Sequence, residues 1–460
     1  MANKYLTAAL CAATLCIFIN KTFAQSSSSF SLNNGEQLTI TTNPLTELNR
    51  TAIQNIVDDT VFNLDNRAPE SLVNQLNSTT DFAAPEWLFS AIAQCERWHQ
   101  KTESRFSCRN GNLKQYWHDY VHGQGLLERR EARKLARSAR VAKVTLSADT
   151  RQVVTDSELV WDFGDLTQAI ILQRIIDYLA SQDITAYHLQ IGLLNAFSGH
   201  DTTWPHQTSL AGNQQSLTLR NTISYEIAPW QQSAYQGSTE QGVISHNDGW
   251  PASKFASHVL SENPIDAVVL GYLAASNTSR FVLSLLDSEK QHLALRDQQQ
   301  RVYYSKHYQA FTGVSPASMQ QVKIRVRLPE FDIADYQGPY AAVWITDTEN
   351  KLLRNLHIRG TGENWLKDLR TWWRKIARKD DSLIDAMSGA TMGNKPIEVN
   401  WDGLDQYGKD VHLDNLLLHV EIAREHGGRT YKKIPLSIRT DKSPLNVEGE
   451  NELHSVQIAF

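Results

Sequence analysis

The residues best suited to covalent chemistry lie in one short segment, residues 385–391. Its sequence is Asp385-Ala386-Met387-Ser388-Gly389-Ala390-Thr391, which reads D-x-x-S-G-A-T. Gly389 and Ala390 leave the backbone uncrowded, so the segment can enter an active site and present the secondary hydroxyl of Thr391. The same segment also has a purely structural interpretation, because Asp385 and Ser388 favour a turn between a helix and a strand. The residues alone leave both interpretations open.

The first three hundred residues carry none of the standard catalytic motifs. The sequence has no glycine-rich phosphate loop of either common spacing, no H-E-x-x-H, no G-x-S-x-G and no metal-spaced set of cysteines. Several local patterns nevertheless resemble, in order, those of the ApbE-like FAD:protein FMN transferases, which cleave FAD and attach its FMN half to a threonine with the help of magnesium. The similar segments, which cover most of residues 38–310, are Leu76-Asn77, residues 106–117, residues 162–169, Gly249-Trp250-Pro251 and Asp266-Ala267.

The resemblance implies a magnesium ligand at Asp266, which opens a segment similar to the family's D-A-L-A-T. It also implies that three groups are missing. Leu270 stands where the family has a metal-binding threonine, Gln168 where it has a lysine, and Gly242 where it has a histidine that can serve as a base. Transfer to an unactivated hydroxyl needs both a base and a cation. We therefore expect a transferase-like domain that no longer transfers; an active, magnesium-dependent FAD:protein FMN transferase that modifies itself or other proteins is the alternative.

Residues 385–391 match the acceptor motif that ApbE-type enzymes modify, in which FMN is joined through its phosphate to the final threonine. The resemblance implies covalent FMN on Thr391, loaded by a separate FMN transferase. The other residues of this candidate cofactor site are Asp385, Ser388, Gly389 and Ala390. The surrounding chain resembles a predicted-periplasmic domain of unknown function that is often fused to such transferases.

The last third of the chain has the period-two alternation of β-strands. Six stretches are expected to be strands: 322–328, 340–346, 352–358, 397–401, 416–422 and 432–438. Turn signals separate them and one amphipathic helix over residues 365–378 interrupts them, which indicates an immunoglobulin-like β-sandwich. Trp365, Trp372 and Trp373 of this helix can stack on a flavin ring or equally well fill the core.

Helices and strands alternate before residue 315, which predicts an α+β domain. Helices are expected over residues 48–62, 85–101, 166–179, 265–273 and 279–286, and strands near 141–146, 153–160, 186–197 and 217–227. Residues 26–29 are expected to be a flexible leader, and residues 106–117 a loop. The basic stretch 126–140 fits a solvated helix face better than a site for an anionic partner.

The first 24 residues have the pattern of a cleavable secretory signal. A short basic region precedes an apolar run over residues 5–19, and Thr22-Phe23-Ala24 places small residues where signal peptidase reads them. No later segment approaches about 18 apolar residues, so we expect a periplasmic protein without a transmembrane segment after cleavage. Cys95 and Cys108 then remain, either as a disulfide or as two small buried thiols.

Composition limits the class of protein. The 460 residues include 45 basic and 50 acidic side chains, which leave no excess positive charge to neutralise nucleic-acid phosphates. We expect a signal peptide (1–24), a transferase-type domain (25–315), a β-sandwich domain with the flavinylation motif (316–442) and a C-terminal tail (443–460). The expected role is electron transfer to envelope redox proteins through covalent FMN, with FAD and Mg²⁺ as further cofactors if the first domain is active. A flavin-free periplasmic scaffold or binding protein is the remaining alternative.

Overall fold

The computed structural model describes residues 26–459 with internal gaps. The undescribed residues are 1–25, 33–34, 44–45, 209–214, 230–242, 287–289, 306–307, 309–311, 313–321, 330–337, 361–365, 380–387, 390–394, 402, 408–410, 412–414, 426, 437–443 and 460. The expected signal peptide therefore lies outside the described residues. Within the described part of the chain, no helix is long and apolar enough to cross a membrane.

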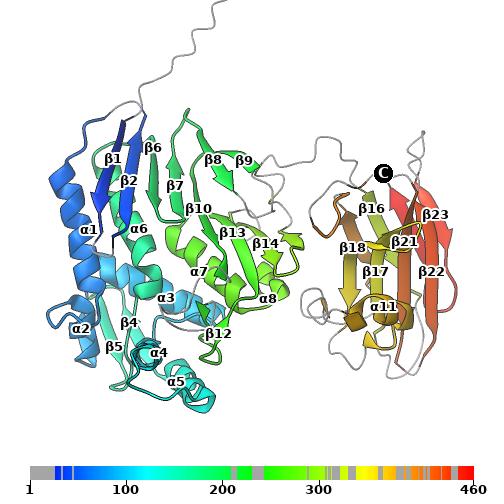
Figure 1. The fold of residues 1–460 in the computed structure, drawn as a ribbon, viewed down its shortest axis with the longest axis horizontal. Helices are drawn as coiled ribbons and strands as arrows, with labels where there is room; N and C mark the ends of the chain where they lie inside the picture. The colour runs from blue at the N-terminus through cyan, green and yellow to red at the C-terminus, as the bar shows by residue number, and fades with distance from the viewer. Residues whose placement is uncertain are drawn as a thin grey trace, which may run out of the picture.

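An eight-stranded antiparallel sheet forms the centre of the N-terminal domain (Figure 1). Its strands, in spatial order, are β1 (Ser26–Ser31), β2 (Gln37–Thr42), β6 (Tyr187–Ile191), β7 (Leu194–Ser198), β10 (Thr222–Ile227), β13 (Phe255–Ser261), β14 (His292–Asp297) and β15 (Val302–Tyr304). Strand β13 is buried at every residue, and its side chains alternate between two hydrophobic clusters: Val259 belongs to the main core and Leu260 to a second cluster. Both faces of the sheet are therefore covered.

Helices cover one face and a hairpin covers the other. The main core contains buried residues of α1 (Arg50–Leu64), α3 (Glu86–Lys101), α6 (Thr167–Ser181) and α7 (Pro264–Ser276). The second cluster includes Trp204 of β8 (Trp204–Thr208) and Leu217 of β9 (Gln215–Leu219), which pair as an antiparallel hairpin. The remaining elements of this domain are α2 (Leu72–Asn77), β3 (Asp81–Ala83), α4 (Gly111–Val121), α5 (Arg129–Val141), β4 (Val144–Ser147), β5 (Gln152–Thr155), η1 (Gly164–Leu166), β11 (Val243–Ile244), β12 (Pro251–Ala252) and α8 (Ser279–Ser284).

Three expectations for this domain are wrong. The serine-rich stretch expected to be a flexible leader is strand β1, which pairs with β2 in register from Ser26 opposite Thr42 and buries Phe30. The segment over residues 106–117, expected to be a loop, contains most of helix α4. The stretch over residues 186–197, expected to be a strand running into a loop, is a hairpin of β6 and β7. For β1 and for the hairpin of β6 and β7, pairing with a neighbouring strand decides the conformation rather than local propensity.

The C-terminal domain is a β-sandwich, as expected. One sheet has the order β20-β16-β24-β23 and the other β19-β18-β17-β21-β22. The strands are β16 (Val322–Arg327), β17 (Tyr340–Asp347), β18 (Leu352–Arg359), β19 (Ser388–Gly389), β20 (Ile397–Trp401), β21 (Leu416–Ala423), β22 (Arg429–Leu436), β23 (Leu445–Glu448) and β24 (Ser455–Ala459). Apolar residues from both sheets form a continuous core between them.

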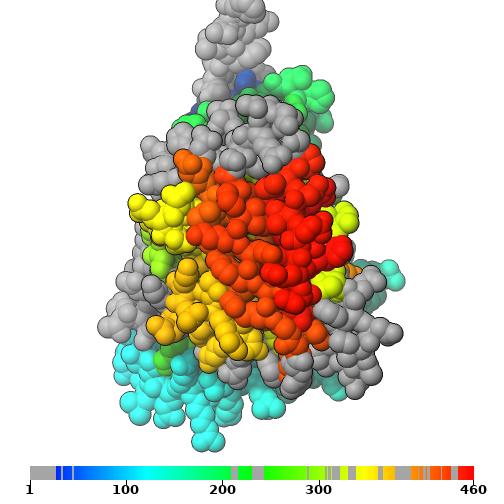
Figure 2. All heavy atoms as spheres, turned by 90° about the vertical axis from the view of Figure 1, so that its right-hand side faces the viewer, coloured from blue at the N-terminus to red at the C-terminus, as the bar shows by residue number. Residues whose placement is uncertain are grey.

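The C-terminal tail expected over residues 443–460 is instead part of this sandwich. Strand β24 pairs with β16 along five residues, and β23 pairs with β24. Val456 and Ile458 are buried in the core because their side chains alternate inward. Figure 2, which looks onto the sandwich end of the molecule, shows these last residues in red beside the preceding strands in orange.

The helix expected over residues 365–378 is shorter than predicted. Helix α11 spans Arg370–Lys375, followed by the 3₁₀ turn η3 (Ala377–Lys379). The fully buried carboxylate of Glu421 accepts hydrogen bonds from the backbone N–H groups of Thr371 (2.9 Å) and Trp372 (2.7 Å), and it pairs with Arg429. The helix is therefore fastened to strand β21 by charge-assisted hydrogen bonds at its first turn.

Candidate functional site

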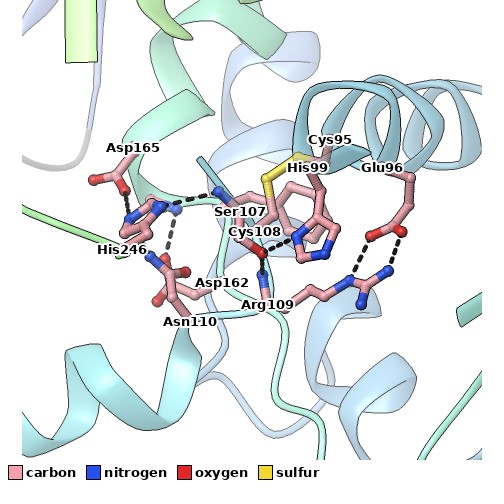
Figure 3. The surroundings of a disulfide bond; sticks show 12 residues. Cys95, Glu96, His99, Ser107, Cys108, Arg109, Asn110, Asp162, Asp165 and His246 are labelled. Atoms are coloured by element: carbon pink, nitrogen blue, oxygen red, sulfur yellow. Dashed lines mark hydrogen bonds and ion pairs between the residues drawn. A yellow bond between two sulfur atoms is a disulfide. The ribbon is translucent and has the colours of Figure 1, made fainter. Parts of the chain in front are cut away.

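The candidate site of the N-terminal domain is built around a disulfide between α3 and the loop that follows it (Figure 3). Cys95 and Cys108 are bonded, with their Cα atoms 5.9 Å apart, and both side chains are buried. This confirms the first of the two interpretations that the sequence left open for these cysteines. The bond ties the loop to the helix and so fixes the residues that follow Cys108.

A buried ion pair fixes the same loop a second time. The guanidinium of Arg109 donates to both carboxylate oxygens of Glu96, including a bond of 2.8 Å from Nε to Oε1. A further guanidinium nitrogen donates to the carbonyl of Ala142 at 2.6 Å. Because Glu96 neutralises its charge and each guanidinium nitrogen donates to a protein group, Arg109 holds the loop in place.

His246 lies at the centre of the site, between the loop and the start of α6 (Figure 3). The backbone N–H of Ser107 donates to its Nδ1 at 2.9 Å, so the proton of the neutral ring resides on Nε2. Nε2 contacts the side-chain amide of Asn110 and lies 3.6 Å from Oδ2 of Asp165. Burial lowers the pKa of His246, which favours this neutral form. With its acceptor nitrogen already engaged, His246 is not arranged as a general base.

Lys114 joins two aspartates next to His246. Its ammonium lies 2.8 Å from Asp162 and 2.9 Å from Asp165. Burial alone would lower the pKa of Lys114, but the two carboxylates raise it above its usual value. Burial would likewise raise the pKa of Asp165, but Lys114 and His246 hold it below its usual range. An ionised carboxylate with so low a pKa is a weak base.

Asp266, the residue that the resemblance implies as a metal ligand, lies in the first turn of α7. Asn263 caps this helix through its side chain, which accepts from the N–H groups of Ile265 and Asp266. The Asp266 carboxylate is only slightly exposed, and three side-chain donors surround it. The indole of Trp98 donates to Oδ1 at 2.7 Å, the amide of Gln291 donates to Oδ2 at 3.1 Å, and the guanidinium of Arg97 pairs with Oδ1.

Of the other three positions of the expected transferase centre, the structure describes two. Leu270, one helical turn after Asp266, is fully buried in the main core. Gln168 donates from Nε2 to both carboxylate oxygens of Glu36 at 2.9 Å. Gly242 lies outside the described residues.

The structure describes only part of the candidate attachment segment. Asp385, Ala390 and Thr391 lie outside the described residues. Ser388 and Gly389 form the short strand β19, which runs parallel to β18 with Ser388 opposite Ile358 and Gly389 opposite Arg359. Ser388 and Gly389 thus lie at the edge of the five-stranded sheet.

The tryptophans expected near a flavin ring divide between the two interpretations. Trp372 is fully buried and donates its indole N–H to Asn355 at 3.0 Å, so it is a core residue. Trp373 is half-buried with the ammonium of Lys367 5.5 Å from its ring centre, and Trp365 lies outside the described residues. Of the three, only Trp373 is both described and partly accessible.

Several residues of the N-terminal site were not found from the sequence. Asp165 belongs to the segment over residues 162–169, which the resemblance had singled out without naming Asp165 itself. Lys114, His246 and Arg97 come from separate elements, and Gln291 precedes β14, so no local spacing relates them to one another. Their relationship exists only in the folded domain.

Comparison with known families agrees with the division into two domains. The ApbE family matches residues 34–222, and a predicted periplasmic protein family (DUF2271) matches residues 321–455. No curated protein matches the chain.

Solved structures of ApbE proteins share the fold of the N-terminal domain. The flavin transferase ApbE from Vibrio cholerae is similar at 15% identity with a TM-score of 0.51, and the match covers 63% of this chain and 99% of that chain. The ApbE protein from Thermotoga maritima matches at 14% identity and a TM-score of 0.53, covering 63% and 99% of the two chains. The flavinyl transferase ApbE of Pseudomonas stutzeri in its apo form matches at 14% identity and a TM-score of 0.52, covering 63% and 98%. The chain therefore combines an N-terminal domain of the ApbE fold, whose residues 34–222 match the ApbE family, with a C-terminal domain whose residues 321–455 match the DUF2271 family of predicted periplasmic proteins.

Proposed function

We propose that the protein is a periplasmic flavoprotein whose C-terminal domain carries FMN covalently on Thr391, while its N-terminal domain keeps the flavin transferase fold without transferring FMN. The covalent flavin would exchange electrons with redox proteins of the cell envelope. The observation that carries the loss of transfer is the pairing of Asp266 with Arg97, Trp98 and Gln291.

The residues around Asp266 do not fit a magnesium ion. Magnesium requires about six oxygen ligands in near-ideal octahedral geometry. Both oxygens of Asp266 already accept hydrogen bonds from nitrogen donors, and Leu270 contributes only carbon to the same helix face. The guanidinium of Arg97 supplies a fixed positive charge where an exchangeable cation would be needed. We derive no transfer step through magnesium in this domain.

The groups near His246 do not replace the missing base. His246 accepts a backbone hydrogen bond on Nδ1, and Asp165 is paired with Lys114. Neither group is therefore poised to remove a proton from an incoming hydroxyl. A separate transferase would have to load the flavin: the oxygen of Thr391 would replace AMP on the FMN phosphorus of FAD, and the threonine proton would leave to that enzyme's base.

The acceptor side of the proposal is supported by the D-x-x-S-G-A-T sequence and by its location on the sandwich. Strand β19 places Ser388 and Gly389 on a sheet edge, which is the position from which a following segment can reach another protein's active site. A covalent tether keeps the cofactor at high effective concentration without requiring a deep pocket.

Intact mass of the full-length mature protein tests both halves of this proposal. Protein from cells with an active FMN transferase should carry the mass of FMN less one water, whereas protein from cells without it should be unmodified. The unmodified protein, incubated with FAD and magnesium, should neither gain this mass nor release AMP. Magnesium-dependent self-modification would favour the active transferase, and an unmodified mass in every preparation would favour a flavin-free scaffold.

A further inference from the structure

Two histidines and a glutamate converge on the face of the large sheet opposite to α7. His206 comes from strand β8 of the covering hairpin, Glu226 from β10 and His258 from β13. Glu226 and His258 are direct partners in the register of neighbouring strands, so their side chains emerge on the same face. One potential ligand atom from each of the three residues lies within 4.8 Å of the other two.

We propose that His206, Glu226 and His258 form a binding site for one zinc ion. Two imidazole nitrogens and one carboxylate are a ligand set that zinc accepts when a fourth position is left for water or another small ligand. Magnesium and calcium prefer sites made only of oxygen, so the two histidines select against them. The site is separate from Asp266, which lies in the helical layer on the other side of the sheet.

The three potential ligand atoms lie within 4.8 Å of one another, and one pair is close to the separation found around a bound zinc ion. Bond lengths of about 2.0–2.1 Å in tetrahedral geometry place neighbouring ligand atoms about 3.4 Å apart. Nε2 of His206 and Oε1 of Glu226 are 3.8 Å apart. A shift of a few tenths of an ångström, on the order of a small side-chain rotation, would bring them to bonding geometry.

Ser224 marks the point on which the two imidazoles converge. Its hydroxyl lies 3.1 Å from Nε2 of His206 and 2.8 Å from Nε2 of His258. These are the nitrogen atoms that we assign to zinc, and both rings are turned toward one location at Ser224. The hydroxyl occupies a place that an ion would take, and it would rotate away when zinc enters.

Tyr308 orients His258 through the ring nitrogen that does not face the proposed zinc position. Its hydroxyl lies 2.6 Å from Nδ1 of His258, and both residues are buried. A metal-ligating histidine commonly uses its other nitrogen in this way, which fixes the tautomer and directs the free lone pair to the metal. His258 therefore has the second contact that a ligand role requires.

The open side of the three ligands faces a cavity. A cavity of about 410 Å³ is lined by His206 and Glu226 and by polar residues of β6 to β8, including Gln190, Asn195 and Gln207. An ion held by three protein ligands would keep its fourth position accessible from this space. The arrangement is that of an exchangeable or reactive zinc site rather than a closed structural one.

Zinc titration of the metal-free full-length protein tests the proposal. Isothermal titration should give one saturable site, and substitution by Co²⁺ should give visible bands of a four- or five-coordinate ion without a thiolate charge-transfer band. The variants His206→Gln and Glu226→Gln should each weaken zinc binding at least tenfold. Tyr308→Phe should weaken it by about 10–100-fold through the orientation of His258.

A surface histidine provides the matched control. His200 is 95% exposed, and His200→Gln should leave zinc binding unchanged. Circular dichroism shows whether each variant is folded. If His206→Gln does not fold, the Glu226→Gln variant still tests the site. The proposal is overturned if the wild-type protein shows no stoichiometric zinc binding, or if both His206→Gln and Glu226→Gln, when folded, bind zinc as the wild type does.

Discussion

The guanidinium of Arg97 and the carboxylate of Asp266 form an ion pair between residues 169 positions apart in the chain. The pair joins the middle of α3 to the first turn of α7. Trp98, the neighbour of Arg97, donates to the same carboxylate oxygen, and the Arg97 guanidinium lies 5.4 Å from the centre of the Trp98 ring. The Asp266 carboxylate is thus bound to donors from the protein itself, so the pairing should contribute to the stability of the domain.

Removing Arg97 should therefore destabilise the N-terminal domain. Asp266 is only 8% exposed, and Arg97→Met would leave its charge with neutral donors alone. The Arg97 side chain is 48% exposed, so solvent would replace part of the lost interaction. We expect a loss of about 1–2 kcal/mol in the free energy of unfolding, measured by urea denaturation.

Lys290→Met is the control for this variant. Lys290 pairs with Glu262 at 2.9 Å, but both side chains are more than half exposed. Such a pair contributes little, so the control should change the free energy of unfolding by less than about 0.5 kcal/mol. Equal effects of Arg97→Met and Lys290→Met would show that Asp266 gains no special support from Arg97.

The disulfide should contribute a larger share of the stability of the same domain. Cys95 and Cys108 are 13 positions apart, and replacing both with alanine should cost about 3 kcal/mol by the chain-entropy estimate for a loop of that size. Urea denaturation measures the loss. Thiol titration of the mature wild-type protein, denatured without reductant, should find no free thiol; two free thiols would contradict the bond.

The sandwich should lose stability on acidification because of His419. This ring is buried, stacks on Trp344, and contacts the hydroxyls of Thr346 (2.9 Å) and Tyr431 (2.8 Å). Burial, with the nearby Lys433 and Lys375 charges, lowers its pKa to about 4, against about 6.5 in an unfolded chain. The unfolded state then binds more protons between these values, so stability is present above pH 6.5 and is lost as the pH falls toward 4.

Comparison of wild type with His419→Gln isolates this effect. Between pH 7 and pH 5 the wild type should lose about 1–2 kcal/mol more than the variant, because only the wild type must keep the imidazole of His419 neutral. Calorimetric unfolding at several pH values measures the difference. Parallel pH profiles of the two proteins would contradict the lowered pKa of His419.

Much of the fold follows from local sequence patterns. Helix α3 was predicted from its spacing of apolar residues, and it begins one residue after the expected start because Pro85 occupies the cap. Five of the six expected strands of the sandwich agree with the structure to within a residue at each end, since alternation and turn residues coincide there. The sixth, expected over residues 432–438, is β22 (Arg429–Leu436).

The failures arise where distant partners decide the conformation. Nothing in the serine-rich sequence of β1 favours a strand, but β2 offers a complete edge and the core accepts Phe30. Likewise, the departures from the family pattern at Leu270 and Gln168 are visible in the sequence, while the groups that pair with Asp266 come from α3 and from Gln291, 25 residues beyond it. The sequence shows where a residue departs from a motif. Only the folded structure shows which residues from elsewhere in the chain contact that position.

The attachment of FMN to Thr391 gives the last prediction. Thr391→Val keeps the shape of the side chain but deletes the hydroxyl oxygen that would bond to the FMN phosphorus. In cells that contain an active transferase, the wild-type protein should fluoresce as a flavin in a denaturing gel, because only a covalent cofactor survives denaturation. Thr391→Val should abolish this signal.

Thr348→Val controls for the loss of a threonine hydroxyl elsewhere in the sandwich. Thr348 is exposed in the turn after β17, well outside the motif in sequence, so this variant should keep full fluorescence. Tryptic peptides should locate the added mass on the peptide that contains Thr391. Fluorescence that persists in Thr391→Val, or a wild-type peptide that is unmodified throughout, would remove the covalent flavin and leave the scaffold as the better account.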